Sequence, residues 1–191
     1  MPEPKVNRRD LIVQTASDLF LQQGYENTSV RQIAEITGMT EAALYYHFKD
    51  GKRGLLQAVV ECQMPDLMGV VEQCSHAASL GELIRYFGQI MSKLGPEKVH
   101  KLRWLIREFQ HLNAEERALL HGKYIRFHQG IAQEMNKFLQ DADKAHVMAW
   151  TLICAMFGYG QLFWSLDLKS AADFHSMQLA EVLAQTFGSA E

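Results

Sequence analysis

Cysteine is scarce in this chain, and its three residues suggest neither a disulfide framework nor a metal site. Cys62, Cys74 and Cys154 are odd in number and do not stand at the spacing of a metal-ligand pair. Reduced thiols in a cytoplasmic protein are therefore expected. The eight histidines form no His-Glu-x-x-His pattern, and His121 and His128 have no cysteine nearby. We expect no bound metal and no cofactor.

Long apolar runs and export signals are also missing. The richest apolar stretch, residues 147–168, is interrupted by two glycines, a glutamine and an aspartate. It therefore lacks the roughly 20 unbroken apolar residues that a membrane span requires. The first five residues carry charges but lead into no apolar core, which argues against a signal peptide. The sequence predicts no membrane association.

Positive charge is not in excess, and catalytic motifs are lacking. The net charge is −3, and residues 1–56 carry seven Lys/Arg and seven Asp/Glu. Nonspecific affinity for DNA rests on local neutralisation of phosphates, so composition alone does not suggest DNA binding. No serine, cysteine or lysine lies in a nucleophile motif, and no glycine-rich phosphate loop follows a strand. We expect that the protein is not an enzyme.

What the chain does contain is helical patterning along its whole length. No segment alternates for long between apolar and polar residues, so we predict an all-α fold of about nine helices. The helix from Lys52 onward contains Pro65, which must kink or interrupt it. Caps and breaks place the helices near residues 8–23, 30–37, 40–47, 52 onward, 83–94, 96 onward, 114–139, 141–166 and 170–187.

Two of the short helices, joined at Gly38 and Met39, predict a helix-turn-helix. The turn needs glycine because its backbone must adopt a positive φ. Thr40 caps the second helix, which buries Leu44 and exposes its other side chains. A helix of this kind presents its N-terminal residues to base edges in the major groove. We predict a DNA-binding domain over residues 1–51, comprising a three-helix unit, and a larger helical body over residues 52–191.

The residues around this motif form a wider pattern. It comprises the run Gly24–Ala34, then Gly38-Met39-Thr40, then the run Ala43–Phe48, and finally Lys52 with Leu55. The pattern resembles the N-terminal signature of the TetR family of transcriptional regulators and covers about residues 8–56. The resemblance implies a C-terminal body that dimerises and senses a small molecule. Two positions depart from the family pattern: Ala42 stands where a glycine is frequent, and Gly51 lengthens the turn before Lys52.

Ten residues are candidate DNA contacts. Donor side chains near helix ends suit phosphate contacts, which set register without reading sequence. Arg31 could reach a guanine edge or a phosphate, and Glu41 could accept from cytosine N4 or favour the helix N-terminus. Each could also be an ordinary solvated residue, and Tyr45 could pack inside the unit. The set is Thr28, Arg31, Thr40, Glu41, Ala42, Ala43, Tyr45, Tyr46, His47 and Lys52.

The body holds all three tryptophans and most of the other aromatic residues. These form either an ordinary core or the lining of a mainly apolar cavity with a few polar groups. Under the second interpretation an unknown, small, mainly apolar effector binds there. The candidate ligand-binding residues are Trp104, Arg107, His111, Phe127, His128, Trp150, Cys154, Phe157, Gln161 and Phe163.

The last two helices predict a homodimer. One carries small residues at Thr151, Ala155 and Gly158, which would permit a close approach of helices. The other carries an apolar stripe at Ala180, Leu183, Ala184 and Phe187. Pairing with a second copy would make a four-helix interface, whereas a core without a partner is the alternative.

Together these patterns predict a DNA-binding regulator, a repressor that an effector releases from double-stranded operator DNA. The helix that Pro65 interrupts is the expected lever between effector and DNA. Four alternatives remain open: an activator, a DNA-binding dimer without a sensor, a catalytic or metal-binding helical protein, and a helical protein–protein module.

Overall fold

The computed structural model describes residues 7–63, 66–93, 104 and 106–188. Within these ranges all regular structure is helical, with nine α-helices and two 3-10 helices, so the predicted all-α fold is confirmed. The chain divides into two compact units. The first unit consists of Met1–Met64 and Trp104–His111, and the second of Pro65–Arg103 and Leu112–Glu191.

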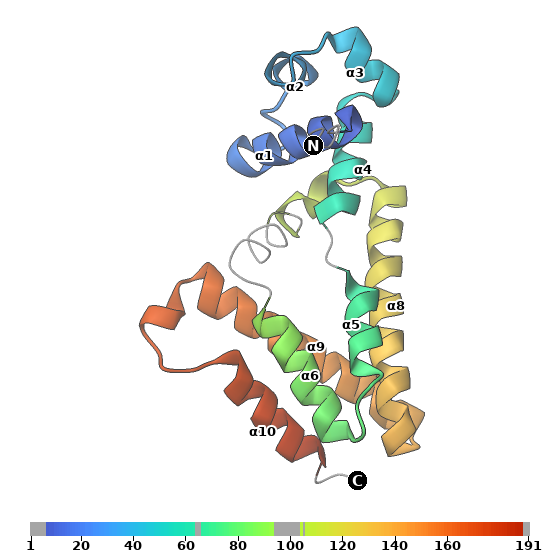
Figure 1. The fold of residues 1–191 in the computed structure, drawn as a ribbon, viewed down its shortest axis with the longest axis vertical. Coiled ribbons are helices and arrows are strands. Elements are labelled where there is room, and N and C mark those ends of the chain that lie inside the picture. Colours follow the sequence, from blue (N-terminus) through green and yellow to red (C-terminus); the bar gives the residue numbers. More distant parts are fainter. Residues whose placement is uncertain (1–6, 64–65, 94–103, 105, 189–191) are drawn as a thin grey trace, which may run out of the picture. The chain divides into compact units, whose positions relative to one another are not determined.

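Four helices and one segment from later in the chain build the first unit (Figure 1). The helices are α1 (Arg8–Gln23), α2 (Val30–Ile36), α3 (Glu41–His47) and α4 (Lys52–Gln63). Trp104 and residues 106–111, which we call the return segment, end in the 3-10 helix η1 (Phe109–His111). The buried apolar side chains of this unit include Ile12, Ala16, Phe20, Ile33, Leu44, Leu55, Leu56, Val59 and Trp104.

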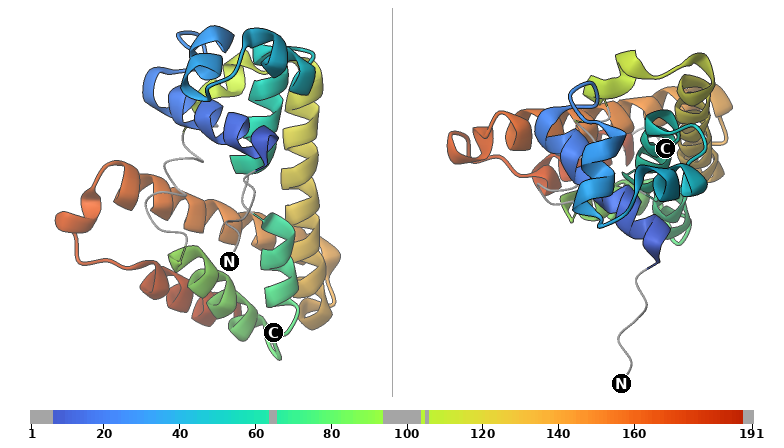
Figure 2. Two further views of the ribbon diagram at one scale, coloured as in Figure 1. Left: turned by 45° about the horizontal axis from the view of Figure 1, so that its top comes forward. Right: turned by 90° about the horizontal axis from the view of Figure 1, so that it is seen from above.

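The second unit is a pack of longer helices. They are α5 (Leu67–Cys74), α6 (Leu80–Ser92), α8 (Ala114–Leu139), α9 (Ala142–Ser165), the 3-10 helix η2 (Leu168–Ser170) and α10 (Ser176–Gly188). Helix α8 packs against α5 and α9, and α6 packs against α10, as the left view of Figure 2 also shows. Phe87, Phe127, Ile131 and Leu152 are among the buried side chains of its core.

Helix α9 combines great length with an apolar surface. Residues Ala142–Trp164 are long and apolar enough to cross a membrane by those two criteria, which core helices of soluble proteins also meet. On one side the helix contributes Leu152 and Met156 to the core. Elsewhere it leaves Val147 and Leu162 exposed. Helix α9 thus carries apolar side chains on both its buried and its exposed side.

Two predicted features of the last helix differ in the structure. The helix begins at Ser176 rather than at residue 170, because residues Leu168–Ser170 form the separate 3-10 helix η2 and residues 171–175 are not helical. The predicted apolar stripe also faces inward. Ala180 and Ala184 are buried, and α10 packs on α6 within the same protomer. Val182 lies on the exposed side instead.

The division into units also departs from the predicted boundary at residues 51 and 52. Helix α4 buries Leu55, Leu56 and Val59 and packs against α1, so it belongs to the first unit. The return segment joins the same unit. Helix α4 ends at Gln63 and α5 begins at Leu67, while Pro65 lies outside the described residues.

Candidate nucleic-acid interface

The connection between α2 and α3 has the geometry of a helix-turn-helix. Gly38 has a φ of +66°, a conformation that glycine adopts without steric cost. The amide of Met39 donates to the Ala34 carbonyl at 2.9 Å and closes the end of α2. The Thr40 hydroxyl accepts from the Ala43 amide at 3.2 Å and starts α3. The structure thus contains both the glycine turn and the threonine cap.

Helix α2 begins with a reciprocal capping box. The Ser29 hydroxyl accepts from the Gln32 amide at 3.1 Å, while the Ser29 amide donates to Gln32 Oε1 at 2.8 Å. Ile33 and Ala34 anchor the inner face of the helix in the core. The outer face, which carries Arg31, remains exposed. A firmly anchored α2 fixes the base from which α3 is presented.

Helix α3 buries a single side chain, Leu44. Tyr46 is 83% exposed, and Glu41 and Ala42 are exposed beside it. The ring of His47 lies edge-on to Tyr46, with ring centroids 5.6 Å apart. Packing does not explain a tyrosine so open to solvent, whereas tyrosines of this kind are enriched at interfaces. We call Arg31, Thr40, Glu41, Ala42, Ala43, Tyr46 and His47 the recognition face.

Tyr45 has a second partner in the turn before α4. Gly51 has a φ of +57°, and a Cβ atom there would lie 2.8 Å from Tyr45 Cε1. The tyrosine ring therefore covers this turn while remaining 46% exposed. Its contact with DNA stays a prediction, because the ring also supports the turn.

Two acidic side chains surround Arg31. Its Nε donates to Glu35 Oε1 at 2.8 Å. This hydrogen bond, followed by the charges of Glu35 and Glu41, raises the pKa of Arg31 above its ordinary value. Arg31 therefore stays charged, and one edge of its guanidinium is held by its own helix.

Thr28 is not available for the predicted phosphate contact. Its side chain is buried, its hydroxyl donates to the Gly24 carbonyl at 2.9 Å, and it accepts from Gln23 Nε2 at 3.1 Å. Both roles of the hydroxyl are thus used inside the turn between α1 and α2. We correct the prediction: Thr28 shapes this turn rather than facing DNA.

Lys52 is also engaged within the first unit. Its Nζ donates to the Glu26 carbonyl at 3.1 Å and lies 4.3 Å from the centroid of the Tyr25 ring. In this structure the amine therefore binds the turn between α1 and α2. The turn containing Gly51 brings it there, so a phosphate contact would require the amine to leave both partners.

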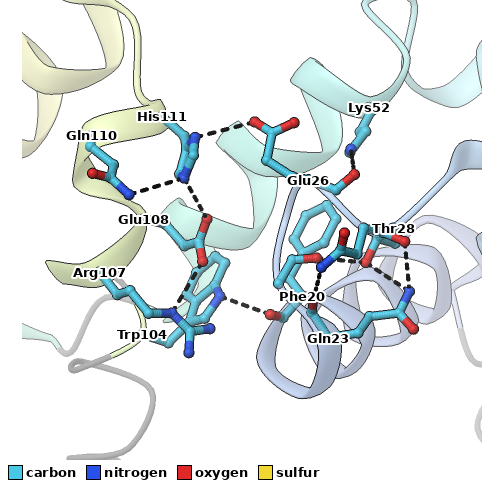
Figure 3. A network of polar contacts seen from close by, with 12 residues as sticks. Phe20, Gln23, Glu26, Thr28, Lys52, Trp104, Arg107, Glu108, Gln110 and His111 are labelled. Carbon is cyan, nitrogen blue, oxygen red and sulfur yellow. Dashed lines mark hydrogen bonds and ion pairs between the residues drawn. The ribbon is translucent and has the colours of Figure 1, made fainter.

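The return segment completes the first unit (Figure 3). The indole nitrogen of buried Trp104 donates to the Phe20 carbonyl at 3.0 Å, and the two rings stack with centroids 6.1 Å apart. His111 Nδ1 lies 3.2 Å from Glu26 Oε1, and its carbonyl accepts from Arg53 at 3.0 Å. These contacts join α1, the following turn and α4 through residues that come much later in the sequence.

Three predicted ligand-binding residues therefore lie in the first unit. Trp104 is part of its core, His111 bridges its turn, and exposed Arg107 places Nε 3.4 Å from Glu108 Oε1. No pattern in the sequence indicates that these residues leave the helical body and return to the N-terminal helices. We correct their assignment accordingly.

The other seven candidates lie in the second unit, at different depths. Phe127 and His128 are buried, and His128 stacks on Trp150 with ring centroids 4.2 Å apart. Phe163 stacks on Tyr159 at 4.5 Å. Trp150 and Cys154 line an open hollow along α9, whose further lining residues are His146, Val147, Thr151 and Ala155. Phe157 and Gln161 are half-buried on the same helix.

Because every lining residue belongs to α9, the hollow is a helix face rather than an enclosed pocket.

Across the described part of the chain, no three histidine, cysteine, aspartate or glutamate side chains come together as a metal site would require.

Comparison with known proteins agrees with this geometry. Residues 12–59 match the family model for bacterial regulatory proteins of the tetR family. A stretch of 78 residues is 32% identical to the transcriptional repressor KstR2 of Mycolicibacterium smegmatis. It covers 41% of this chain but only 38% of that relative, so the sequence match spans less than two thirds of KstR2. The match to the TetR family thus covers the N-terminal, helix-turn-helix part of the chain.

The TetR-family fold extends over the rest of the chain. The TetR-family regulator PfmR of Thermus thermophilus aligns with a TM-score of 0.70 at 19% identity, covering 94% of this chain and 95% of that one. AibR, solved in complex with isovaleryl coenzyme A and operator DNA, aligns with a TM-score of 0.65 at 21% identity. That alignment covers 94% of this chain and 97% of AibR. The predicted family resemblance is therefore confirmed.

Sequence reasoning missed the residues that brace the TetR-family helix-turn-helix from outside. Glu26 and Arg53 both contact His111, a partner that is distant in the sequence, and no spacing in the sequence indicates these contacts. Glu108 and His111 do stand three residues apart, a helical neighbour spacing, but this does not reveal that Glu26 faces them.

Proposed function

We propose that this chain is a transcriptional regulator whose recognition face enters the major groove of double-stranded operator DNA. One observation carries the proposal: a braced helix-turn-helix whose second helix turns Tyr46, Glu41 and Ala42 to solvent. Repression is the favoured outcome, because the curated relative KstR2 is named a repressor. The regulator would act in the cytoplasm, where its DNA lies.

The charge balance favours selective rather than general DNA binding. Residues 1–56 carry seven basic and seven acidic side chains. Nonspecific affinity depends on how many phosphates are neutralised, so little of it is expected here. Base contacts from the recognition face must then supply much of the binding free energy, which makes the operator strongly preferred over other DNA.

Selection of bound duplexes from a random pool tests this proposal. We expect enrichment of a near-palindrome whose half-sites lie about one helical turn apart, or somewhat more. The Tyr46→Ala variant should lose this enrichment. Arg126→Ala, an exposed change on α8, should retain it. No enrichment by the wild type, or equal enrichment by Tyr46→Ala, would overturn the proposal.

We further propose a homodimer, with α9 as its main contact. The argument is that α9 exposes Val147 and Leu162, which are 61% and 49% exposed, and that Leu166 just after it and Val182 of α10 are 65% and 57% exposed. Covering such a surface with a second copy removes apolar area from water. Gly158→Asp probes this contact, since a Cβ at that position meets no other atom within 4 Å of the protomer.

The reactivity of the exposed thiols tests the proposed α9 interface in solution. Cys62 on α4 and Cys154 on α9 are both exposed in the protomer, whereas Cys74 is buried. In a dimer joined through α9, Cys154 should react slowly and Cys62 quickly with a thiol reagent. Gly158→Asp should yield monomers in sedimentation and make Cys154 react as fast as Cys62. Equal reactivity of the two thiols in a wild-type dimer would rule out this interface.

For the effector we propose a small, mainly apolar molecule bound in the second unit. Trp150 and Cys154 lie on the face assigned to the partner copy, so the proposed ligand contacts are Phe127, His128, Phe157, Gln161 and Phe163. Support comes from AibR, a protein of this fold solved with isovaleryl coenzyme A and operator DNA. Binding would favour a state with lower DNA affinity.

A thermal-shift screen with fatty acids, acyl-coenzyme A thioesters and aromatic compounds tests the effector proposal. A hit should also lower operator affinity, and Phe157→Ala should weaken both effects. If no compound shifts the unfolding temperature, the alternative of a DNA-binding dimer without a sensor stands. A hit that raises operator affinity would indicate a ligand-dependent activator or co-repressor instead.

A further inference from the structure

His111 lies between two carboxylates in the first unit (Figure 3). Its Nδ1 is 3.2 Å from Glu26 Oε1, and its Nε2 is 3.9 Å from Glu108 Oε2. The first carboxylate belongs to the turn between α1 and α2, and the second to the return segment. The imidazole therefore links this turn to the return segment.

The two carboxylates differ in their exposure. The Glu26 side chain is 66% exposed, while that of Glu108 is 5% exposed. A buried carboxylate is costly unless a positive group or several donors compensate it. Arg107 supplies one such group, with Nε 3.4 Å from Glu108, but its own side chain is 60% exposed. An imidazolium at His111 would supply the second.

Every charged neighbour of the ring bears on the sign of its response to pH. On α4, Lys52 and Arg53 direct their charges to backbone carbonyls, those of Glu26 and His111. The two acidic side chains, in contrast, face the ring nitrogens themselves. Among the other described neighbours, Arg107 lies beside Glu108, and the Tyr25 ring centroid is 6.3 Å from that of the imidazole. The amide nitrogen of Gln110 is 3.3 Å from Nε2, so a proton on Nε2 requires this uncharged amide to turn its oxygen toward the ring.

Glu26 connects this site to the recognition face. It lies in the turn just before Ser29, the residue that caps α2, and its carbonyl accepts from Lys52. Fixing Glu26 therefore fixes the start of α2, which carries Arg31. A pre-ordered turn lowers the ordering cost of DNA binding and raises affinity.

We propose that His111 is a proton-responsive positioning residue of the DNA-binding unit. Its protonated ring, held by Glu26 and Glu108, locks the turn before α2, and loss of the proton loosens the turn and weakens DNA binding. The proposal rests on the proposed function in one respect, the readout through DNA. Affinity should therefore rise as the pH falls from 8 to 6.

The pH profile of operator affinity separates this role from a merely structural one. His111→Gln keeps a hydrogen-bond donor toward Glu26 but cannot gain a charge. Between pH 8 and pH 6 the wild type should gain about fivefold more affinity than His111→Gln, at the lower end of usual couplings between sites. Parallel profiles for the two proteins would overturn the proposal.

His47 provides the matched control, because its protonation would act on DNA directly from α3. His47→Gln should reduce the gain in operator affinity between pH 8 and pH 6, but the share of that gain that depends on His111 should remain. Glu26→Gln, a change at an exposed side chain, should flatten the profile in the same way as His111→Gln. A Glu26→Gln profile identical to that of the wild type would also overturn the proposal, whether or not the His111 variant folds.

Hydrogen exchange of the Trp104 indole tests the lock without DNA. This N–H donates to the Phe20 carbonyl inside the first unit, so opening of the return segment should expose it. At pH 6 the indole N–H should exchange several-fold faster in Glu26→Gln than in the wild type, whereas at pH 8 the two rates should be similar. If the ratio of the two exchange rates is the same at pH 6 and pH 8, the proposal is overturned. If this test succeeds while no DNA binds at any pH, only the proposed function fails.

Discussion

Replacing Trp104 by phenylalanine tests whether the return segment belongs to the core of the first unit. The change keeps an aromatic ring against Phe20 but removes the indole N–H that donates to the Phe20 carbonyl at 3.0 Å. That carbonyl also accepts from the Gly24 amide at 3.0 Å, so it is not left without a partner. The loss is therefore that of one hydrogen bond and of part of a buried ring.

The magnitude follows from these two losses. A buried hydrogen bond contributes about 1 kcal/mol to stability. Trp104 is 3% exposed, and the smaller ring forfeits apolar contact worth roughly 1 kcal/mol more. We expect Trp104→Phe to lower the free energy of unfolding by about 2 kcal/mol. For a chain of this size the unfolding temperature should fall by roughly 4–8 °C.

Urea and thermal unfolding followed by circular dichroism measure this loss, and operator affinity measures its consequence. Trp150→Phe is the control, since Trp150 is half-buried on α9 and lies in the second unit. It should cost less stability than Trp104→Phe. A loss below about 0.5 kcal/mol for Trp104→Phe would refute the reasoning. So small a loss would be expected of a tryptophan that lines a ligand site, not of one in the core.

Three further outcomes are expected. Gly51→Ala should destabilise the protein by about 1–3 kcal/mol in urea, because of its φ of +57° and its approach to Tyr45, whereas Gly122→Ala, which meets no atom within 4 Å, should not. The Cys74 thiol should react with a thiol reagent at pH 8 only after unfolding, since burial raises its pKa to about 12. Arg85 lowers the pKa of Glu181 by a hydrogen bond, so this pair stabilises the fold above the usual pKa of a glutamate and loses its effect as the pH falls through the lowered value. Arg85→Gln should therefore flatten the acid side of the curve of unfolding temperature against pH.

Local signals predicted the helix-turn-helix well. Helix α1 runs over the expected residues 8–23, Gly38 adopts a positive φ, and Ser29 and Thr40 cap α2 and α3 as expected. These features depend on hydrogen bonds between residues no more than about five positions apart. A single sequence contains the whole of that information.

Features that depend on distant partners could not be predicted in this way. Trp104 binds Phe20, which lies 84 positions earlier, and its aromatic character fitted a ligand pocket equally well. Thr28 had the right chemistry for a phosphate contact, but only the structure shows that its hydroxyl is used in the turn. The apolar stripe on α10 had the correct periodicity, yet periodicity does not say whether α6 or a second copy covers it.

Operator affinity of Tyr46→Ala, measured on the selected duplex, tests most directly whether the recognition face binds DNA. At 83% exposure the Tyr46 side chain contributes little to folding, so a loss of affinity would arise at the interface itself. We predict a loss of about 1–3 kcal/mol in binding free energy with unchanged unfolding temperature. Ile125→Ala, at a 46% exposed side chain on α8, should bind as the wild type does. Wild-type affinity for Tyr46→Ala together with weakened binding by Ile125→Ala would contradict the account.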